Sequence, residues 1–126
     1  MNLVDAAVAE PIDESLVSSD VLGIGRVIGS ADASIGLSVR KSGRTTGLTD
    51  GKITAIDAVV EVDYGGGRTA IFREQIVSDV LSQGGDSGSL VVDSRSRAVG
   101  LLFAGGPTTT LINPIGAVLH ALDLSI

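Results

Sequence analysis

The chain has 126 residues, which fits one domain that buries about two thirds of its unfolded surface. Its net charge is −6, and it has neither a basic stripe nor a group of aromatic residues on which bases could stack. These features argue against nucleic acid and anionic membranes as partners. The chain has no cysteine, which excludes disulfides and cysteine-bound zinc or iron–sulfur clusters. No cofactor and no metal site is indicated.

The sequence also bears on localisation. No apolar run is long enough to cross a bilayer. The first residues, Met-Asn-Leu-Val-Asp, lack the basic and apolar regions of a signal peptide. The compartment stays open, although the absence of cysteine is more typical of the cytoplasm.

Composition indicates an all-β protein. The 17 glycines suit many tight turns, and only three residues are aromatic, Tyr64, Phe72 and Phe103, so valine, isoleucine, leucine and alanine must supply most of the core. In chain order, we expect a short strand at residues 3–9, a polar connector at 10–20, an edge segment at 21–28 and a strand at 37–41.

The next elements are bounded by glycine turns. Thr49-Asp50-Gly51 predicts a turn. The longest strand is expected at residues 53–64, where apolar and acidic residues alternate, and Gly65-Gly66-Gly67 closes a hairpin onto residues 69–77. Further strands are predicted at residues 89–93, 98–106 and 108–112. About six antiparallel strands form a small barrel or a sandwich.

The chain is expected to end in a short helix. Asn113 can cap it, and Pro114 suits its first turn. Ile115, Val118 and Leu119, followed by Leu122, then fall on one helical face.

Residues 84–90, Gly-Gly-Asp-Ser-Gly-Ser-Leu, carry the functional information. A nucleophilic hydroxyl needs exposure, a base and fixed donors for the developing oxyanion. Ser87 supplies the hydroxyl. Gly85 does not block its own N–H, and Gly88 lets a carbonyl approach, so the amides of Gly85 and Ser87 can converge as an oxyanion hole. The alternative is a glycine-rich turn between strands.

This motif resembles the nucleophile segment of the trypsin/chymotrypsin-like serine peptidases, especially the bacterial type without disulfides. In that family, as at residues 89–106 here, an apolar strand, a turn and a strand ending in glycine follow the nucleophile. The resemblance implies a six-stranded antiparallel β-barrel of the trypsin-like type, the second of two barrels, with a short C-terminal helix. Residues 21–126 would form this barrel. Residues 1–20 would be a strand and connector left from the interface with a missing first barrel.

The resemblance also identifies a candidate acid and exposes a missing base. Residues 5–9 resemble the family's Asp-x-Ala segment, so Asp5 is the candidate that orients the catalytic histidine; otherwise it is a polar residue beside an edge strand. The single histidine, His120, is expected to lie opposite the helix's apolar stripe and to face solvent, with a favourable position near a helix C-terminus. The family's histidine belongs to the first barrel.

Other roles follow from the resemblance. Asp86 would support the oxyanion loop through an unknown partner, or it is an ordinary turn-forming aspartate. Leu81 would form the base of the specificity pocket, with Phe103, Ala104 and Gly105 on one wall, which suits a small or apolar substrate side chain; Leu81 can also be a core residue. The segment 41–47 lacks the ending of a P-loop, and we expect it to pack near the oxyanion loop instead.

Two functions from different classes remain. On the first hypothesis, which the resemblance implies, the chain would be the C-terminal half of a trypsin-like serine endopeptidase, inactive alone for want of a histidine base, and would act on peptides or proteins once a His-bearing barrel completes it. Alternatively, it is a non-catalytic binding or self-assembly module that associates through exposed apolar surface. A β-barrel unrelated to peptidases is a third reading.

Overall fold

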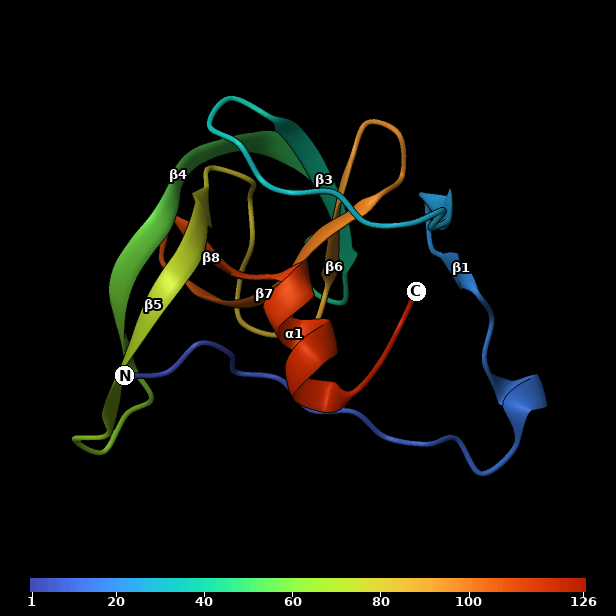
Figure 1. Cartoon of the computed structure of the whole chain (residues 1–126), viewed down its shortest axis with the longest axis horizontal. Coiled ribbons are helices and arrows are strands. Elements are labelled where there is room, and N and C mark those ends of the chain that lie inside the picture. The colour runs from blue at the N-terminus through green and yellow to red at the C-terminus, as the bar shows by residue number, and fades with distance from the viewer.

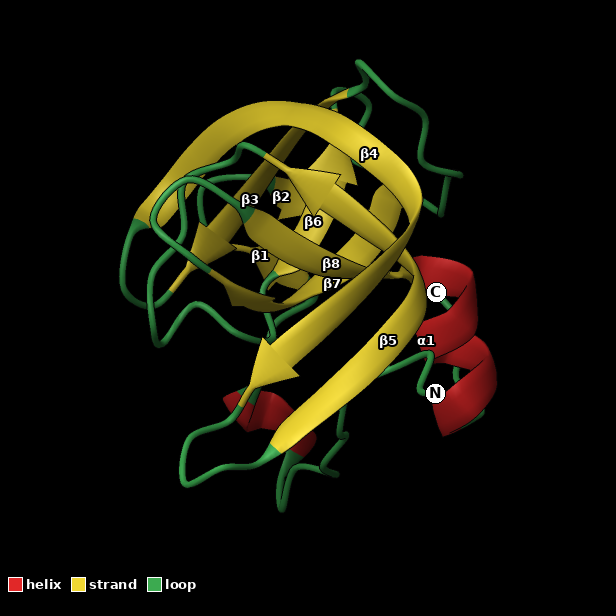
Figure 2. Ribbon diagram, turned by 90° about the vertical axis from the view of Figure 1, so that its left-hand side faces the viewer, coloured by secondary structure: helices red, strands yellow, loops and turns green.

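A computed structural model describes all residues, 1–126. Its main body is a closed barrel of six antiparallel strands in the order β3-β4-β5-β8-β7-β6, with β6 paired to β3 (Figure 1, Figure 2). The strands are β3 (Ser38–Gly43), β4 (Gly47–Asp63), β5 (Thr69–Ser78), β6 (Leu90–Asp93), β7 (Ala98–Gly105) and β8 (Thr110–Pro114). The predicted all-β barrel of six strands with one C-terminal helix is therefore confirmed.

The β4–β5 pair is the longest ribbon of the barrel, and its far end projects beyond the other strands (Figure 2). Gly65, Gly66 and Gly67 all have positive φ and make its turn, as the sequence predicted. The pairing shifts register three times between Ile53 and Val60. Such bulges bend a strand and increase its twist, which lets one 17-residue strand follow the barrel and then leave it.

The predicted turn at Thr49-Asp50-Gly51 is wrong, because these residues lie inside β4. The chain reverses earlier, at residues 44–46. Gly51 is needed for another reason: a Cβ there would come within 2.6 Å of the Val80 amide nitrogen. Here glycine permits a close approach of two backbones.

Aliphatic side chains fill the barrel, and aromatic ones close its hairpin end. The main cluster is buried and comprises Val39, Ile53, Ile76, Val91, Val99, Leu102 and Ile112. A second cluster under the hairpin joins Val62, Phe72 and Phe103, whose two rings lie 5.0 Å apart. This second cluster packs against Ala104 and Leu111 and so supports the β7 segment that lines the site.

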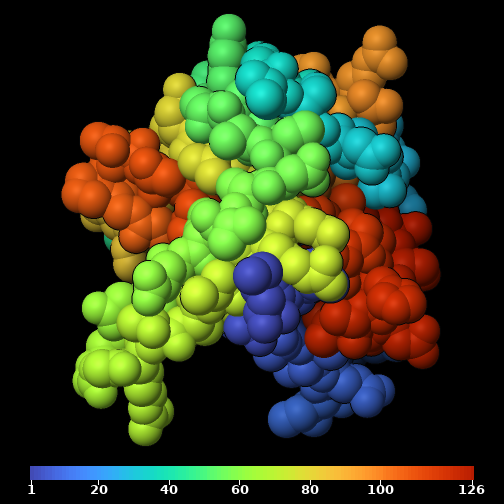
Figure 3. All heavy atoms as spheres, turned by 60° about the vertical axis from the view of Figure 1, so that its left-hand side comes forward, coloured from blue at the N-terminus to red at the C-terminus, as the bar shows by residue number.

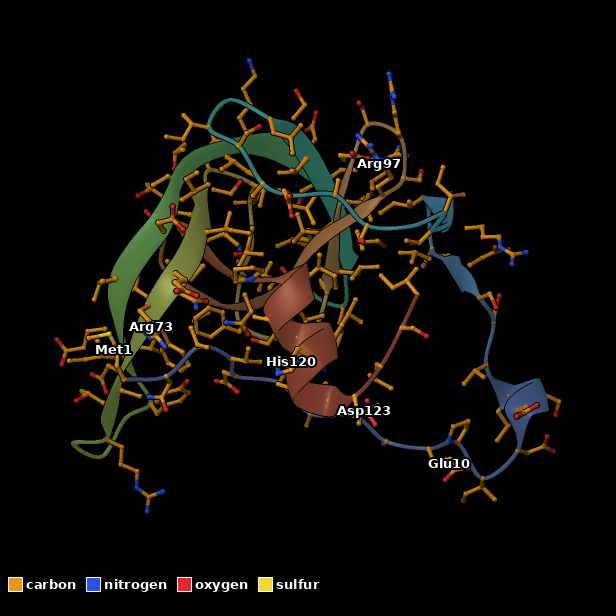
Figure 4. The ribbon with its side chains drawn as sticks, viewed as in Figure 1. Met1, Glu10, Arg73, Arg97, His120 and Asp123 are labelled. Carbon is orange, nitrogen blue, oxygen red and sulfur yellow. The ribbon has the colours of Figure 1, made fainter.

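The first 37 residues contain little regular structure. The strand predicted at residues 3–9 is absent, and the segment pairs with the barrel only at two isolated bridges, Asn2 with Phe72 of β5 and Ser30 with Ala98 of β7. A single turn of 3₁₀ helix, η1 (Glu14–Leu16), and a small hairpin of β1 (Asp20–Val21) with β2 (Gly25–Arg26) follow. Figure 4 shows Glu10 on the extended part of this segment, away from the barrel ribbons.

Helix α1 (Ile115–Leu122) packs against β7 and β8 and buries Ile115 and Val118, as predicted. The predicted cap, Asn113, is wrong, because the Asn113 side chain bonds elsewhere. Pro114 is the N-cap, and it makes no side-chain hydrogen bond. The buried Asn113 amide instead donates to Gln75 Oε1 at 2.6 Å and accepts from the Asp5 amide. The helices include none with the length and hydrophobicity that a membrane span requires.

Candidate active site

Ser87 lies in the loop between β5 and β6, and its side chain is exposed on the wall of a cavity of about 750 Å³. Its hydroxyl lies 3.2 Å from the carbonyl oxygen of Phe103, to which it donates. A carbonyl cannot take a proton as a general base does. The hydroxyl is therefore placed for reaction but is not activated by any group of this loop.

The backbone around Ser87 keeps two donors free. The amides of Asp86, Gly88 and Ser89 donate to backbone carbonyls of Gln83, Leu102 and Asp86. Those of Gly85 and Ser87 donate to no other group of the chain. Two free donors, two residues apart and beside an exposed hydroxyl, are what an oxyanion hole requires.

Gly85 has a positive φ of 103°, which disfavours any side chain. A Cβ there would also overlap the Thr45 hydroxyl, which donates to the carbonyl of Gly84 at 2.8 Å. Glycine at this position thus lets the loop close against the turn between β3 and β4.

Asp86 is fully buried behind the loop and accepts four hydrogen bonds. Its Oδ1 accepts from the amides of Thr45 and Thr46, at 2.8 and 3.1 Å. Its Oδ2 accepts from the Thr46 hydroxyl and the Gln83 amide, at 2.6 and 3.0 Å. The predicted packing of segment 41–47 against the oxyanion loop is confirmed by these bonds.

Lys41 completes this network. Its side chain is also fully buried, and its Nζ lies 3.8 Å from Asp86 Oδ2 and donates to the Thr46 hydroxyl and the Gly47 carbonyl. The buried carboxylate of Asp86 thus lies near a buried ammonium group, and the Thr46 hydroxyl lies between the two and bonds to both. Such a pair holds its geometry because loss of either partner leaves an uncompensated charge.

The two pKa values reflect this arrangement. Burial alone would raise the pKa of Asp86, but the hydrogen bonds from Thr46, Gln83 and Thr45 outweigh it and hold the pKa far below the usual range. Burial lowers the pKa of Lys41, and the attraction of Asp86 opposes that shift only in part. Asp86 is thus a charged support for the loop and not a proton acceptor for Ser87.

The cavity beside Ser87 lies between the end of β4 and the β7–β8 turn. Phe103, Ala104 and Gly105 line it, as do residues 61–64 and 82–84. Leu81 does not line it. Its side chain is 52% exposed, and its carbonyl accepts from the Thr49 hydroxyl. The specificity predicted from an apolar base at Leu81 therefore has no structural basis.

Asp5 lies at the edge of this region. Its Oδ2 accepts a 2.5 Å hydrogen bond from the hydroxyl of Tyr64, and Tyr64 lines the cavity of Ser87. Its Oδ1 accepts no hydrogen bond. Burial and the bond to Asp5 raise the pKa of Tyr64 to about 12. Asp5 itself lines a second cavity, which shares Tyr64 with the cavity of Ser87, and no hydrogen bond links Asp5 to Ser87.

His120 is exposed on α1, as predicted, and is absent from the cavity lining (Figure 4). It is the only histidine of the chain. No group of three or more histidine, aspartate or glutamate side chains is arranged to hold a metal ion. The site therefore consists of a hydroxyl, two free amides, their support and a cavity.

Comparisons with known proteins agree with this geometry. No protein-family model matches the chain. It is 38% identical over 79 residues to serine protease 2 of Streptomyces fradiae and 34% identical over 102 residues to streptogrisin-D of Streptomyces griseus. Among solved structures, it superposes on Cellulomonas bogoriensis chymotrypsin with a TM-score of 0.72 at 30% identity, over 82% of the chain. Thermobifida fusca protease A gives 0.71 at 29% identity.

The chain belongs to the trypsin/chymotrypsin-like serine peptidases. It matches part of each relative, spanning 42% and 25% of the two curated proteins and 56% and 55% of the two solved chains. In a two-barrel peptidase, a single barrel with the nucleophile loop and a C-terminal helix is the second barrel. The predicted family and portion are both confirmed.

The sequence analysis did not identify Lys41 as the buried partner of Asp86. Lys41 follows Val39 at the two-residue spacing of a strand, so it shares the buried face of β3. A lysine in phase with core residues needs a buried counter-charge. That spacing was the available signal, and Asp86 was the acidic residue of the loop that segment 41–47 was expected to contact.

Proposed function

We propose that this barrel supplies the nucleophile and the oxyanion-binding loop of a serine endopeptidase, and that the histidine base comes from outside these 126 residues. The observation that carries the proposal is the exposed Ser87 hydroxyl beside the free amides of Gly85 and Ser87. The hydrogen bonds of Asp86 hold this loop in shape, and they do not depend on contact between the loop and the base. A preorganised loop of this kind lowers the barrier to acyl transfer.

Each residue then has a definite task. Ser87 Oγ attacks the peptide carbonyl, and the amides of Gly85 and Ser87 bind the oxyanion. Asp5 orients the incoming imidazole with its free Oδ1, while Oδ2 keeps its bond to Tyr64. Phe103, Ala104 and Gly105 line the substrate cavity. Residues 1–20 lie at the interface with the first barrel.

In this proposal the 126-residue chain alone is inactive as a peptidase. The Ser87 hydroxyl donates its hydrogen bond to a backbone carbonyl and not to a base, and the single histidine is on the surface of α1. Removal of one member of a catalytic triad leaves only the residual catalysis of the oxyanion hole and binding. The expected loss relative to a complete site is at least about 10⁴-fold.

A fluorophosphonate probe tests the proposal. The longer reading frame that contains this segment is expected to encode a His-bearing barrel, and its product is expected to label at Ser87. Ser87→Ala abolishes the label, whereas Ser94→Ala, which removes an exposed hydroxyl from the turn between β6 and β7, keeps it. The 126-residue chain labels at background. A long product that fails to label, or efficient hydrolysis by the short chain that Ser87→Ala abolishes, would contradict the proposal.

The second candidate is a binding or self-assembly module. It is favoured by exposed apolar side chains, among them Ile12 and Leu22, which are 102% and 86% exposed. Such groups in water favour association. Light scattering across a hundredfold range of concentration distinguishes this candidate. A mass that stays monomeric throughout counts against it.

A further inference from the structure

Two amide side chains, those of Gln75 and Asn113, are fully buried beside the start of the chain. Asn113 donates to Gln75 Oε1 at 2.6 Å, and Gln75 Nε2 donates to the carbonyl of Arg73 at 2.7 Å. Their other two bonds leave the barrel. Gln75 Nε2 also donates to the Leu3 carbonyl at 2.7 Å, and Asn113 Oδ1 accepts from the Asp5 amide at 3.1 Å. The amide pair thus binds the N-terminal segment at two alternate residues.

Packing alone does not explain two buried amides at this place. Burying an amide costs free energy unless its groups are hydrogen-bonded. Two apolar side chains of similar size would fill the same space without that cost. The bonds to the first residues of the chain offset it, so the pair is explained by the segment that it holds.

A β-bulge in β5 turns Gln75 toward this segment. Residues 73 and 74 of β5 lie opposite the single residue 59 of β4, and Gln75 follows them. Glu74 has a positive φ of 62°, which residues with a side chain rarely adopt. Bulges of this kind re-aim the side chains beside them. The strand therefore accepts an unfavourable backbone conformation where it points Gln75 inward.

The attachment of the segment ends at Asp5. Asn2 pairs with β5, donating to the Ile71 carbonyl at 2.8 Å and accepting from the Arg73 amide at 2.9 Å. Beyond the Asp5 amide, no residue bonds to the barrel before Ile28. Figure 3 shows the first residues, in dark blue, seated between the β4–β5 hairpin and the red C-terminal residues. Asp5 therefore combines a fixed amide nitrogen with an exposed side chain.

Groups that take part in a reaction must be held within about 0.5 Å of their working position by hydrogen bonds behind them. Because it takes Asp5 as the residue that orients an incoming imidazole, the next step rests on the proposed function. We infer that Gln75 and Asn113 are positioning residues of the peptidase site, which fix the place of Asp5 relative to the cavity of Ser87.

Hydrogen exchange in the 126-residue chain tests the attachment itself. Relative to their intrinsic rates, the Asp5 amide is expected to exchange at least about tenfold more slowly than the amides of Ala7 and Val8, which donate to no other group. This measurement needs no variant. Equal protection of the three amides in the wild-type chain overturns the inference.

Two variants of similar size remove the amides. In Gln75→Met and in Asn113→Leu, the Asp5 amide is expected to exchange as fast as its unbonded neighbours. The matched control is Thr110→Val, which removes another buried polar group of β8, a hydroxyl that bonds to the Val80 carbonyl. It should keep the protection of Asp5. Circular dichroism establishes that each variant is folded, and a folded Asn113→Leu that keeps the protection overturns the inference.

The phenol of Tyr64 reports on the Asp5 carboxylate, because it donates to Asp5 Oδ2. In both variants its titration is expected to move from about 12 toward 10, as the carboxylate leaves it. Thr110→Val should leave the titration near 12. A titration that stays near 12 in folded Asn113→Leu means that Asp5 keeps its place without the amide, which overturns the inference.

The longer product tests the role in the reaction. Asn113→Leu is expected to slow fluorophosphonate labelling at Ser87 about 10- to 100-fold, because the base loses its orientation, whereas Thr110→Val keeps the wild-type rate. A nearby carboxylate raises the pKa of a histidine, so the pH midpoint of labelling should fall by about one unit when Asp5 moves away. A merely structural loss would lower the fraction of protein that labels and leave that midpoint unchanged.

The outcomes separate this inference from the proposed function. If the wild-type longer product labels, and Asn113→Leu labels at the same rate with the same pH midpoint, the inference is wrong and the proposed function stands. If the wild-type longer product never labels, the proposed function is wrong, and the positioning role falls with it.

Discussion

Asp86 shows how one buried carboxylate can fix the loop of Ser87 from behind. Its four hydrogen bonds join the loop of Ser87 to the turn at Thr45 and Thr46, and Lys41 balances its charge. A Cβ on Gly43 would overlap its Oδ1, so β3 passes directly over the carboxylate. The loop's shape is thus determined within the barrel.

We predict that Asp86→Asn lowers the free energy of unfolding by about 3–5 kcal/mol, because it leaves Lys41 buried without its counter-charge. Lys41→Met should cost a similar amount. Urea denaturation followed by circular dichroism measures both. The double variant Lys41→Met/Asp86→Asn should cost less than the sum of the two single changes. Additive costs would show that the pair is not coupled.

The same network sets an acid dependence. The pKa of Asp86 is lower in the folded than in the unfolded protein, so its stabilisation is complete above the unfolded value of about 3.9 and is lost as pH falls below it toward the folded value. Asp86→Asn should therefore flatten the fall in stability below pH 4. Asp93, whose pKa is also lowered, contributes a separate part of that fall.

Tyr64 permits a direct test of the Asp5 contact, because it is the only tyrosine and the chain has no tryptophan. We predict that its phenol titrates near pH 12, from ultraviolet absorbance near 295 nm, and that Asp5→Asn moves the titration toward 10. Because the folded pKa is raised, the stabilisation is present below pH 10 and is lost as pH rises through 12. An unchanged titration in Asp5→Asn would separate Tyr64 from Asp5.

At the scale of elements, close packing between β7 and β8 depends on Gly100. A Cβ there would overlap Ile112 Cγ2 and lie 2.5 Å from the carbonyl oxygen of Asn113. We predict that Gly100→Ala destabilises the protein by about 1–3 kcal/mol by overpacking. Gly116→Ala is the matched control, since nothing lies within 4 Å of its Cβ in helix α1. It should stabilise by about 0.5–1 kcal/mol. Chemical denaturation of both variants measures the difference, and similar effects would contradict it.

Periodicity and turn chemistry predicted most of the strands, and their failures have physical causes. Tri-glycine 65–67 marked the hairpin correctly because positive φ is needed there. Gly51 was mistaken for a turn because a glycine required by a neighbouring backbone has the same local signature. Asn113 looked like a cap, but a tertiary contact with Gln75 uses its amide. Contacts between distant segments decide these cases.

The sequence also predicted only part of the candidate site. The motif around Ser87 is local, and the sequence alone placed the hydroxyl and its flanking glycines. Leu81 was assigned by its distance from Ser87 along the chain, yet it is exposed and does not line the cavity. Residues 61–64 entered the sequence analysis only as part of an alternating strand. That they line the same cavity as Ser87 depends on how β4 curves, which no short pattern records.

At the scale of the whole molecule, the barrel and the N-terminal segment differ in how they are held. Backbone pairing closes the barrel through all six strands. Between the Asp5 amide, which donates to Asn113, and the Ile28 amide, which donates to Ser96, the segment makes no hydrogen bond to the barrel. Its bonds there are local, within η1 and the β1–β2 hairpin. Segments with few tertiary contacts open at low free energy.

Limited proteolysis with a glutamate-specific protease is therefore expected to cut first after Glu14, which is exposed and outside the strands, whereas the bond between Glu10 and Pro11 resists such a protease. Glu61 and Glu74 are equally exposed but lie within the β4–β5 ladder, so a protease must first open the barrel to reach their backbone. Mass spectrometry over time should show residues 15–126 persisting after the first cuts. Early cleavage after Glu61 or Glu74 would mean that the hairpin opens as readily as the N-terminal segment.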